Sequence, residues 1–157
     1  RASENLTLTF AGSYNDANLQ DPFWRNDDDR LAGEAPTAPK GTAMPYVPKL
    51  QLTAIARMNF KLGELPGFGQ LALSHNDSAW NNLEVDQRKQ MDSYTVMNLS
   101  AGIEQEDWTL TVYANNVTDQ RGQTDILDPG YFSPSGMEYN ESIIRPRSFG
   151  IRWAKRF

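Results

Sequence analysis

Hydrophobic and polar residues alternate with a period of two along the last ten residues of the chain, SFGIRWAKRF. This period places successive side chains on opposite faces of a β-strand, so residues 148–157 predict a strand with one apolar face. That face would carry Phe149, Ile151, Trp153 and Phe157. A strand between lipid and a wet lumen has this pattern because the two solvents differ. The pattern therefore favours a transmembrane β-barrel.

Five further segments show strand-like alternation, at about 4–14, 47–60, 68–76, 93–103 and 108–118. The connections between the six segments are alternately long and short. Outer-membrane barrels have long external loops and short periplasmic turns, and a last strand that ends in the periplasm requires the first, third and fifth connections to be external. Those three are the long ones. We therefore predict an all-β fold, an antiparallel transmembrane β-barrel portion of about six up-and-down strands with long external loops.

The composition agrees with strands that span a membrane and argues against membrane helices. No run of the chain approaches the roughly 18 apolar residues of a spanning helix, and the mean hydropathy is −0.62. A barrel retains such a low value because only every second strand residue meets lipid and its loops are polar. The chain has no cysteine, which excludes disulfides and thiolate metal sites.

Charge is distributed unevenly along the chain. Acidic residues outnumber basic ones in the long polar segments 15–43, 77–92 and 119–144, whereas residues 145–157 contain five basic residues and no acidic one. Acidic loops disfavour a polyanionic substrate, although divalent cations that bridge lipopolysaccharide would account for them equally well. Outside the last strand there is no basic stripe with interleaved aromatic residues, so nucleic acid is not expected as a partner.

Aromatic residues gather where the predicted strands end. We interpret them as the girdles that such barrels place at both membrane interfaces, although aromatic residues also favour strands in general. The residues are Tyr14, Tyr46, Phe60, Phe68, Tyr94, Trp108, Phe149 and Phe157.

Four segments in series resemble the C-terminal barrel of TonB-dependent receptors: MPYVPKLQLTAIARMNF, YTVMNLSAGIE, DWTLTVYANNVTD and IIRPRSFGIRWAKRF. Asn116-Val117-Thr118-Asp119, after a strand that starts with tryptophan, is similar to the ending of that family's penultimate strand. Arg145-Pro146-Arg147, ahead of a final strand that ends in phenylalanine, is similar as well. The resemblance covers essentially the whole chain.

The resemblance implies an active transporter of the bacterial outer membrane that imports a small-molecule nutrient, often an iron–siderophore complex. It also implies a 22-stranded barrel, filled by an N-terminal plug whose leading segment contacts the TonB complex. The chain departs from the family in lacking the plug and most of the barrel, so residues 1–157 are expected to be the C-terminal part of a larger barrel domain. Membrane lipid and lipopolysaccharide would surround it, and the barrel-assembly machinery would recognise its last strand.

The external loops supply candidates for the ligand entrance. Aromatic side chains there would stack on a ligand or fold the loops onto one another, and acidic ones would hold a hard cation or remain solvated. The candidates are Trp24, Asp27, Asp28, Asp29, Arg30, Trp80, Tyr131 and Phe132. Facing the lumen, Arg57, Arg152 and Arg156 would meet an anionic plug or ligand, or pair with acidic residues of the wall.

Nothing in the sequence predicts an enzyme. The single histidine, His75, shares parity with Leu71 and Leu73 and is expected on the lipid side, and a zinc site without a second histidine or any cysteine would need three carboxylates. No cofactor or metal is expected. Two alternatives to the receptor remain open, a small passive outer-membrane barrel or porin and a secreted β-sandwich that acts as a binding module.

Overall fold

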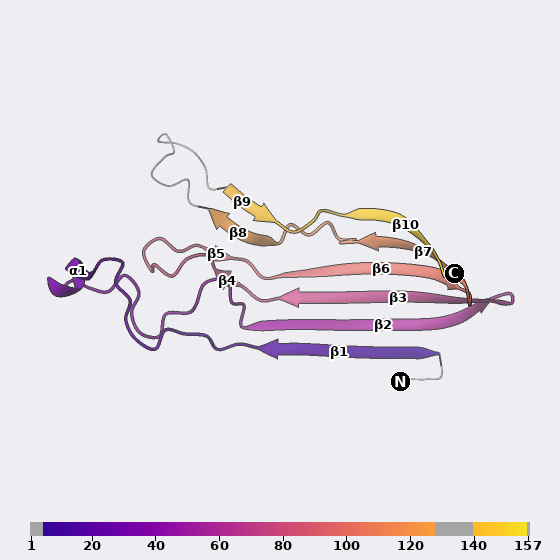
Figure 1. Ribbon diagram of the computed structural model, residues 1–157, viewed down its shortest axis with the longest axis horizontal. Helices are drawn as coiled ribbons and strands as arrows, with labels where there is room; N and C mark the ends of the chain where they lie inside the picture. The colour runs from indigo at the N-terminus through magenta and orange to yellow at the C-terminus, as the bar shows by residue number, and fades with distance from the viewer. Residues whose placement is uncertain (1–4, 128–139, 157) are drawn as a thin grey trace.

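The computed structural model describes residues 5–127 and 140–156, and its main element is one antiparallel sheet of six strands (Figure 1). The order of strands in the sheet is β1-β2-β3-β6-β7-β10, so each long strand lies beside the next one along the chain. The strands are β1 (Leu6–Tyr14), β2 (Leu50–Leu62), β3 (Leu65–Asn76), β6 (Tyr94–Glu104), β7 (Trp108–Asn115) and β10 (Ser148–Lys155). This arrangement confirms the predicted all-β, up-and-down antiparallel fold.

The connections separate by length onto the two ends of the sheet. The long ones, which we call loop 1 (15–49), loop 2 (77–93) and loop 3 (116–147), extend from one end, and the short turns 63–64 and 105–107 lie at the other (Figure 1). The first turn is tighter than expected, because β2 and β3 stay paired up to Leu62 and Leu65. Gly63 makes this possible with a φ of 66°, a conformation that glycine adopts at little cost.

Small elements lie within the long loops, which the hydrophobic pattern had shown only as polar stretches. Loop 1 contains the short helix α1 (Asp27–Leu31), and loop 2 contains the hairpin of β4 (Ala79–Trp80) and β5 (Gln90–Met91). Loop 3 contains the hairpin of β8 (Gln123–Leu127) and β9 (Asn140–Ile143). In the part of the chain that the structure describes, no helix is long and apolar enough to cross a membrane.

Strand register gives the sheet two chemically distinct faces. Directly paired residues share a face, so cross-strand rows can be followed through the whole sheet. One row is entirely apolar and consists of Leu8, Ala56, Leu71, Leu99, Ala114 and Phe149. The next row, on the other face, consists of Thr7, Arg57, Gln70, Ser100, Tyr113 and Gly150. We call these the apolar face and the polar face.

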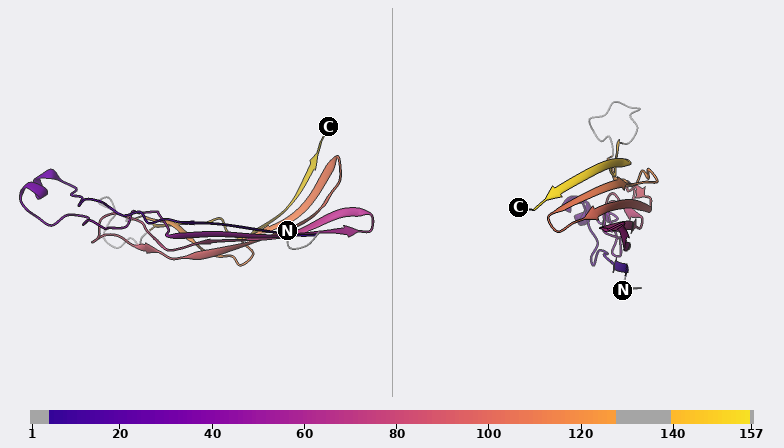
Figure 2. Two further views of the ribbon diagram at one scale, coloured as in Figure 1. Left: turned by 90° about the horizontal axis from the view of Figure 1, so that it is seen from below. Right: turned by 90° about the vertical axis from the view of Figure 1, so that its right-hand side faces the viewer.

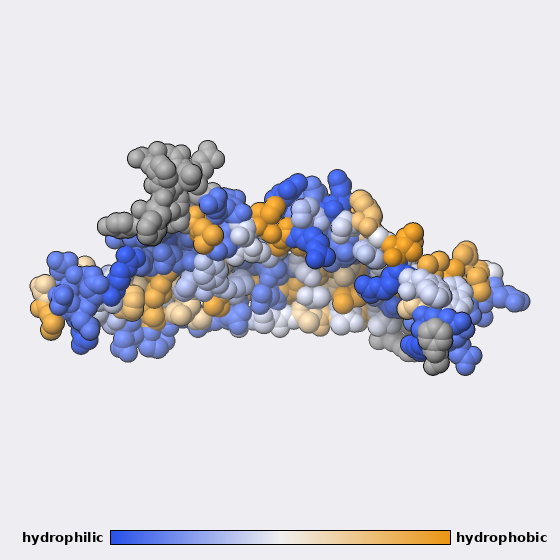
Figure 3. All heavy atoms as spheres, turned by 45° about the horizontal axis from the view of Figure 1, so that its top comes forward, coloured by the Kyte–Doolittle hydropathy of each residue, from blue (hydrophilic) through white to orange (hydrophobic). Residues whose placement is uncertain are grey.

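The apolar face is not covered by any other layer of the described chain. Figure 2 shows the sheet edge-on as a single curved layer, and hydrophobic side chains reach the molecular surface in Figure 3. Phe10 is 75% exposed and Ile151 is 73% exposed. A secreted β-sandwich would bury these residues against a second sheet. The other two sheets of the described residues are two-stranded hairpins, so these residues supply no second sheet of a sandwich.

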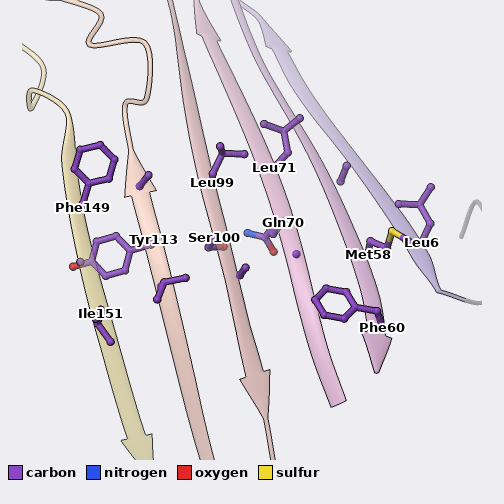
Figure 4. A pocket seen from close by; sticks show the side chains of 16 residues that line it. Leu6, Met58, Phe60, Gln70, Leu71, Leu99, Ser100, Tyr113, Phe149 and Ile151 are labelled. Carbon is purple, nitrogen blue, oxygen red and sulfur yellow. The ribbon is translucent and has the colours of Figure 1, made fainter. Parts of the chain in front are cut away.

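A hollow of about 880 Å³ lies on the apolar face (Figure 4). Its centre is formed by Gly69 and Ala101, which are register partners and carry almost no side chain. Larger residues border it, with Phe60 of β2 on one side and Ile151 of β10 on the other. The hollow is therefore a consequence of small residues in the middle of the sheet.

Two of the aromatic residues expected in the girdles lie on the polar face. Phe68 is paired with Gly102 and Tyr94 with Asn76, so both have the parity of the polar rows. Phe68 is only 6% exposed, because its ring packs across Gly102 on the next strand. An aromatic ring that covers a glycine stabilises a sheet locally. These two rings therefore pack within the protein instead of forming a membrane interface.

Candidate functional site

Charged side chains of the polar face gather in the half of the sheet that carries the short turns. There Arg57 of β2 places Nη2 2.7 Å from Oε2 of Glu104 on β6. The Arg57 guanidinium also lies 3.9 Å from the centre of the Phe68 ring, a cation–π contact. Both partners of the ion pair are partly exposed, so the pair contributes at most about 1 kcal/mol to stability.

The two remaining arginines proposed for the lumen lie on or beside β10. Arg152 is on the polar face, with its guanidinium 5.9 Å from the centre of the Tyr113 ring on β7. That ring in turn packs against Gly150, where a Cβ atom would clash with the tyrosine hydroxyl. Arg156 follows the end of β10, and its backbone N–H donates to the carbonyl of Asp107 at 2.8 Å.

Three of the candidate entrance residues, Trp24, Asp27 and Arg30, line one cavity of about 460 Å³ at the tip of loop 1. The Arg30 guanidinium lies 5.8 Å from the Trp24 ring, and Trp24 Nε1 donates to the carbonyl of Glu34 at 3.1 Å. A positive group over an indole and a nearby carboxylate together offer stacking and hydrogen bonding to a ligand.

The two other acidic candidates of loop 1, Asp28 and Asp29, belong to the helix α1. Asp28 and Asp29 lie in the first turn of α1 and do not line the cavity. Acidic residues at this position interact favourably with the N-terminal end of a helix. Asn26 Nδ2 donates to Asp29 Oδ2 at 3.3 Å. Among the described residues, no three histidine, cysteine, aspartate or glutamate side chains form a group that could hold a metal ion.

Trp80 lies in β4 of loop 2, apart from the tip of loop 1 (Figure 1). The guanidinium of Arg88 stacks 4.2 Å from its ring, and its carbonyl accepts the backbone N–H of Tyr46 at 2.8 Å. The structure therefore does not bring Trp80 and Trp24 into one site. The remaining candidates Tyr131, Phe132 and Phe157 lie outside the described residues.

The three loops are bound to one another by side chains that sequence reasoning did not single out. Loops 1 and 2 are joined by an ion pair of Arg25 and Glu84, in which Nε and Oε1 are 2.8 Å apart. Hydrogen bonding to Glu84 raises the pKa of Arg25. Loops 2 and 3 are joined where Asn81 Nδ2 donates to the carbonyl of Ile126 at 2.6 Å. No spacing in the sequence indicates these pairs, because their members come from different loops.

Loops 1 and 3 meet at Tyr46, whose hydroxyl donates to Asp125 Oδ1 at 2.8 Å. This hydrogen bond is the main cause that raises the pKa of Tyr46, because the ionised tyrosine could not donate it. Tyr46 also has a φ of 60°, in the left-handed region that residues other than glycine seldom occupy. The surrounding bonds must hold it there, which is typical of functional or strained positions.

A buried asparagine follows the end of β7 from which loop 3 begins. Asn116 is 3% exposed, has a φ of 49° and donates from Nδ2 to the carbonyls of Gln120 and Arg145. Three residues on, Asp119 Oδ1 accepts the backbone N–H of Arg147 at 3.0 Å. This bond, aided by the Arg121 guanidinium, holds the pKa of Asp119 below its ordinary value of 3.8. The turn thus connects the end of β7 to the segment that enters β10.

The chain was compared with known proteins on the basis of its sequence and its fold. The family model described as TonB dependent receptor-like, beta-barrel matches residues 2–117 of the 157 residues. The chain belongs to this family. No curated protein and no solved structure matches it.

Membership in the TonB-dependent receptor family has direct functional consequences. Receptors of this family are transporters that act in the bacterial outer membrane, and they interact with TonB and with a ligand. The two-faced sheet fits this setting, because one face is suited to lipid and the other to water. In a receptor barrel the three long loops would face the outside of the cell, where ligand is first met.

Proposed function

We propose that residues 1–157 are the C-terminal part of the barrel of a receptor that imports a scarce nutrient, most simply an iron–siderophore-type complex. Energy would come from the TonB complex, through a plug that lies outside these residues. Six strands are too few to enclose a plug, since even small closed barrels have about eight. The two outer edges of the sheet, on β1 and β10, have no strand partner among the described residues.

The observation that carries the proposal is the sheet with an uncovered apolar face and all its long loops at one end. Water would penalise this face, whereas the acyl chains of the outer membrane would match it. The hollow at Gly69 and Ala101 would then be filled by lipid. Lipopolysaccharide would contact the barrel near the external loops, and the barrel-assembly machinery would bind β10, the last strand.

The external loops would form part of the ligand entrance, and the cavity of Trp24 and Arg30 is one place where ligand would be met. On the polar face of the sheet, Arg57 and Arg152 would face the lumen of the barrel. The aromatic contacts of both guanidiniums hold them against the wall, and a smooth wall leaves room for a plug. No residue is expected to carry out covalent chemistry.

The test is radioactive uptake in cells that lack the gene and are complemented with the full-length receptor. Ferric siderophores, cobalamin and oligosaccharides would be supplied in parallel, with and without an intact TonB system. We expect uptake of a ferric siderophore that requires both the receptor and TonB. Uptake of cobalamin or a glycan alone would overturn the iron assignment, and uptake that continues without TonB would favour a passive porin.

A matched pair of variants tests the part played by loop 1. Trp24→Ala removes the ring that lines the cavity, and we expect it to lower uptake at limiting ligand concentration. The control is Leu31→Ala, which also shortens a hydrophobic side chain of loop 1 but at a position that is 84% exposed and lines no described cavity. Equal uptake by the two variants would show that the cavity lined by Trp24 takes no part in ligand uptake.

A further inference from the structure

A second, smaller cavity of about 200 Å³ lies where the three loops meet the polar face of the sheet. Gln51 of β2, Asn76 of β3 and Tyr94 of β6 line one side of it. These residues form a single cross-strand row, because Asn76 is the register partner of both Gln51 and Tyr94. The cavity therefore opens on the water-facing side of the sheet, at the end where ligand would enter.

Each external loop contributes to the remaining lining of this cavity. Loop 1 provides Tyr46, loop 2 provides Asp77 and Asp92, and loop 3 provides Gln123 and Thr124. No other described cavity is lined by residues from all three loops. A ligand bound here would contact every external loop at once.

The lining is held in place before any ligand binds. The hydroxyl of Tyr46 is tied to Asp125, and the backbone N–H of Asp92 donates to Gln123 Oε1 at 3.3 Å. Loop 3 also packs against the Tyr94 ring at Gly122, where no side chain would fit. A site formed in advance loses less conformational entropy on binding than one that must be ordered by its ligand.

The charge of the cavity is negative. Its lining includes two acidic residues, the half-buried Asp77 and the exposed Asp92, and contains no lysine, arginine or histidine among the described residues. Asp77 Oδ1 accepts the backbone N–H of Ser78 at 2.8 Å, whereas the Asp92 carboxylate has no hydrogen-bond or ion-pair partner in the described part of the chain. The lining thus offers acceptor oxygens to a positive group and nothing that would neutralise a negative one.

We propose that the cavity between the three loops binds a positively charged, primary ammonium portion of the transported ligand. An ammonium has three donors and no acceptor, which matches carboxylate oxygens that lack a cationic partner. A carboxylate or phenolate group in the same place would be repelled. The proposal rests on the proposed function and narrows it, because it selects ferric hydroxamates that carry a free amine over the strongly anionic ferric catecholates.

The site can be probed without knowing the ligand. We would measure binding of n-pentylammonium to the purified full-length receptor by saturation-transfer NMR, with pentan-1-ol and pentanoate as probes of the same length. We expect the ammonium to bind about tenfold more tightly than either, since hydrogen bonds to charged groups are the stronger ones. Equal binding of the three probes would overturn the proposal.

Two sets of variants assign the binding to this cavity. Asp92→Asn alone, and together with Asp77→Asn, should abolish the preference for the ammonium while retaining the shape of the side chains. Asp86→Asn removes the same charge from loop 2 at an exposed position outside the cavity lining and should leave the preference unchanged. A preference that survives in both the single and the double variant would place ammonium binding elsewhere and refute the assignment.

A ligand series separates this inference from the proposed function. Uptake would be measured for ferrioxamine B, which carries a free amine, and for its neutral N-acetyl and anionic N-succinyl derivatives. The cavity predicts uptake in that order, and loss of the order in Asp92→Asn. If pentylammonium binds through Asp92 and no ferric complex is imported, the cavity stands and the iron proposal fails. If the three complexes enter equally well, the ammonium assignment fails and the iron proposal stands.

Discussion

The side-chain amide of Asn116 donates a hydrogen bond to the backbone carbonyl of Arg145 at 3.0 Å, across 29 residues of sequence. Through this contact the end of β7 holds the segment that leads into β10. Asn116 also receives the N–H of Gln120 and gives its own N–H to Asn98 on β6. One buried side chain with its backbone therefore joins β6, loop 3 and the entry to the last strand.

Replacement of Asn116 by alanine should destabilise the barrel by about 2 kcal/mol or more, because two carbonyls and the N–H of Gln120 would lose the partner that its buried side chain provides. The full-length receptor would be unfolded thermally, and folded and unfolded forms would be separated by their different mobility in detergent gels. Asn82→Ala, in loop 2, is the control for removal of an asparagine side chain from outside this turn. A melting temperature equal to that of the control would mean that water takes over the hydrogen bonds of the Asn116 side chain.

Substitution by alanine should affect the stability of the sheet differently at two of its glycines, Gly102 and Gly69. A Cβ atom at Gly102 would lie very close to the backbone carbonyl oxygen of Leu110 and 2.9 Å from the Phe68 ring, so Gly102→Ala requires backbone movement. At Gly69 the nearest atom would be 3.9 Å away, an ordinary contact. We expect Gly102→Ala to cost about 1–3 kcal/mol and Gly69→Ala to be nearly neutral. Equal thermal stabilities would contradict this packing of Phe68.

Neighbouring residues of β1 test which face meets lipid. Phe10 lies on the apolar face and Thr9 on the polar face. Phe10→Arg should destabilise the folded state in lipid vesicles by about 2–4 kcal/mol, because a charge near the middle of the bilayer is costly. Thr9→Arg should change it by less than about 1 kcal/mol. The opposite order would assign lipid to the polar face and refute the orientation of the sheet.

The lowered pKa of Asp119 predicts an effect at acidic pH. A carboxyl group whose pKa is lower in the folded than in the unfolded state stabilises the fold above its ordinary pKa of about 4, and this contribution is lost as the pH falls through the folded value. Hydrogen exchange of the segment around Arg147 should therefore accelerate as the pH falls below about 4, after correction for intrinsic rates. Asp119→Asn, which has no charge to lose, should show no such step.

The period-two pattern was sufficient to predict the six long strands, because a strand between two solvents has to alternate. The segment from Ser148 onward was assigned correctly by this argument, as was the position of His75 on the apolar face, where it is paired with Leu52 and Thr95. What the pattern could not reveal is the structure of the loops. Strands of two residues, such as Ala79–Trp80, contain no period and form only when a distant partner is present.

The aromatic residues show a second limit of the sequence pattern. Phe68 and Tyr94 lie at strand ends, as interface residues do, but their rings pack over Gly102 and Gly122. Parity along the strand places Phe68 on the face opposite to Leu71, as the structure does, whereas a position at a strand end alone suggests a membrane interface. The cavity around Asp92 was missed for a different reason. Its lining comes from three loops, and only their folding brings these residues together.

The directions of the two edge strands limit the number of further strands that a complete barrel can have. Because β1 and β10 are separated by four strands and every neighbour is antiparallel, the two open edges run in opposite directions. A ring in which every neighbouring pair remains antiparallel must then be completed by an even number of further strands. An odd number would force one parallel seam, in which the hydrogen bonds are slanted. Any sequence proposed as the remainder of this receptor can be judged by counting its strands.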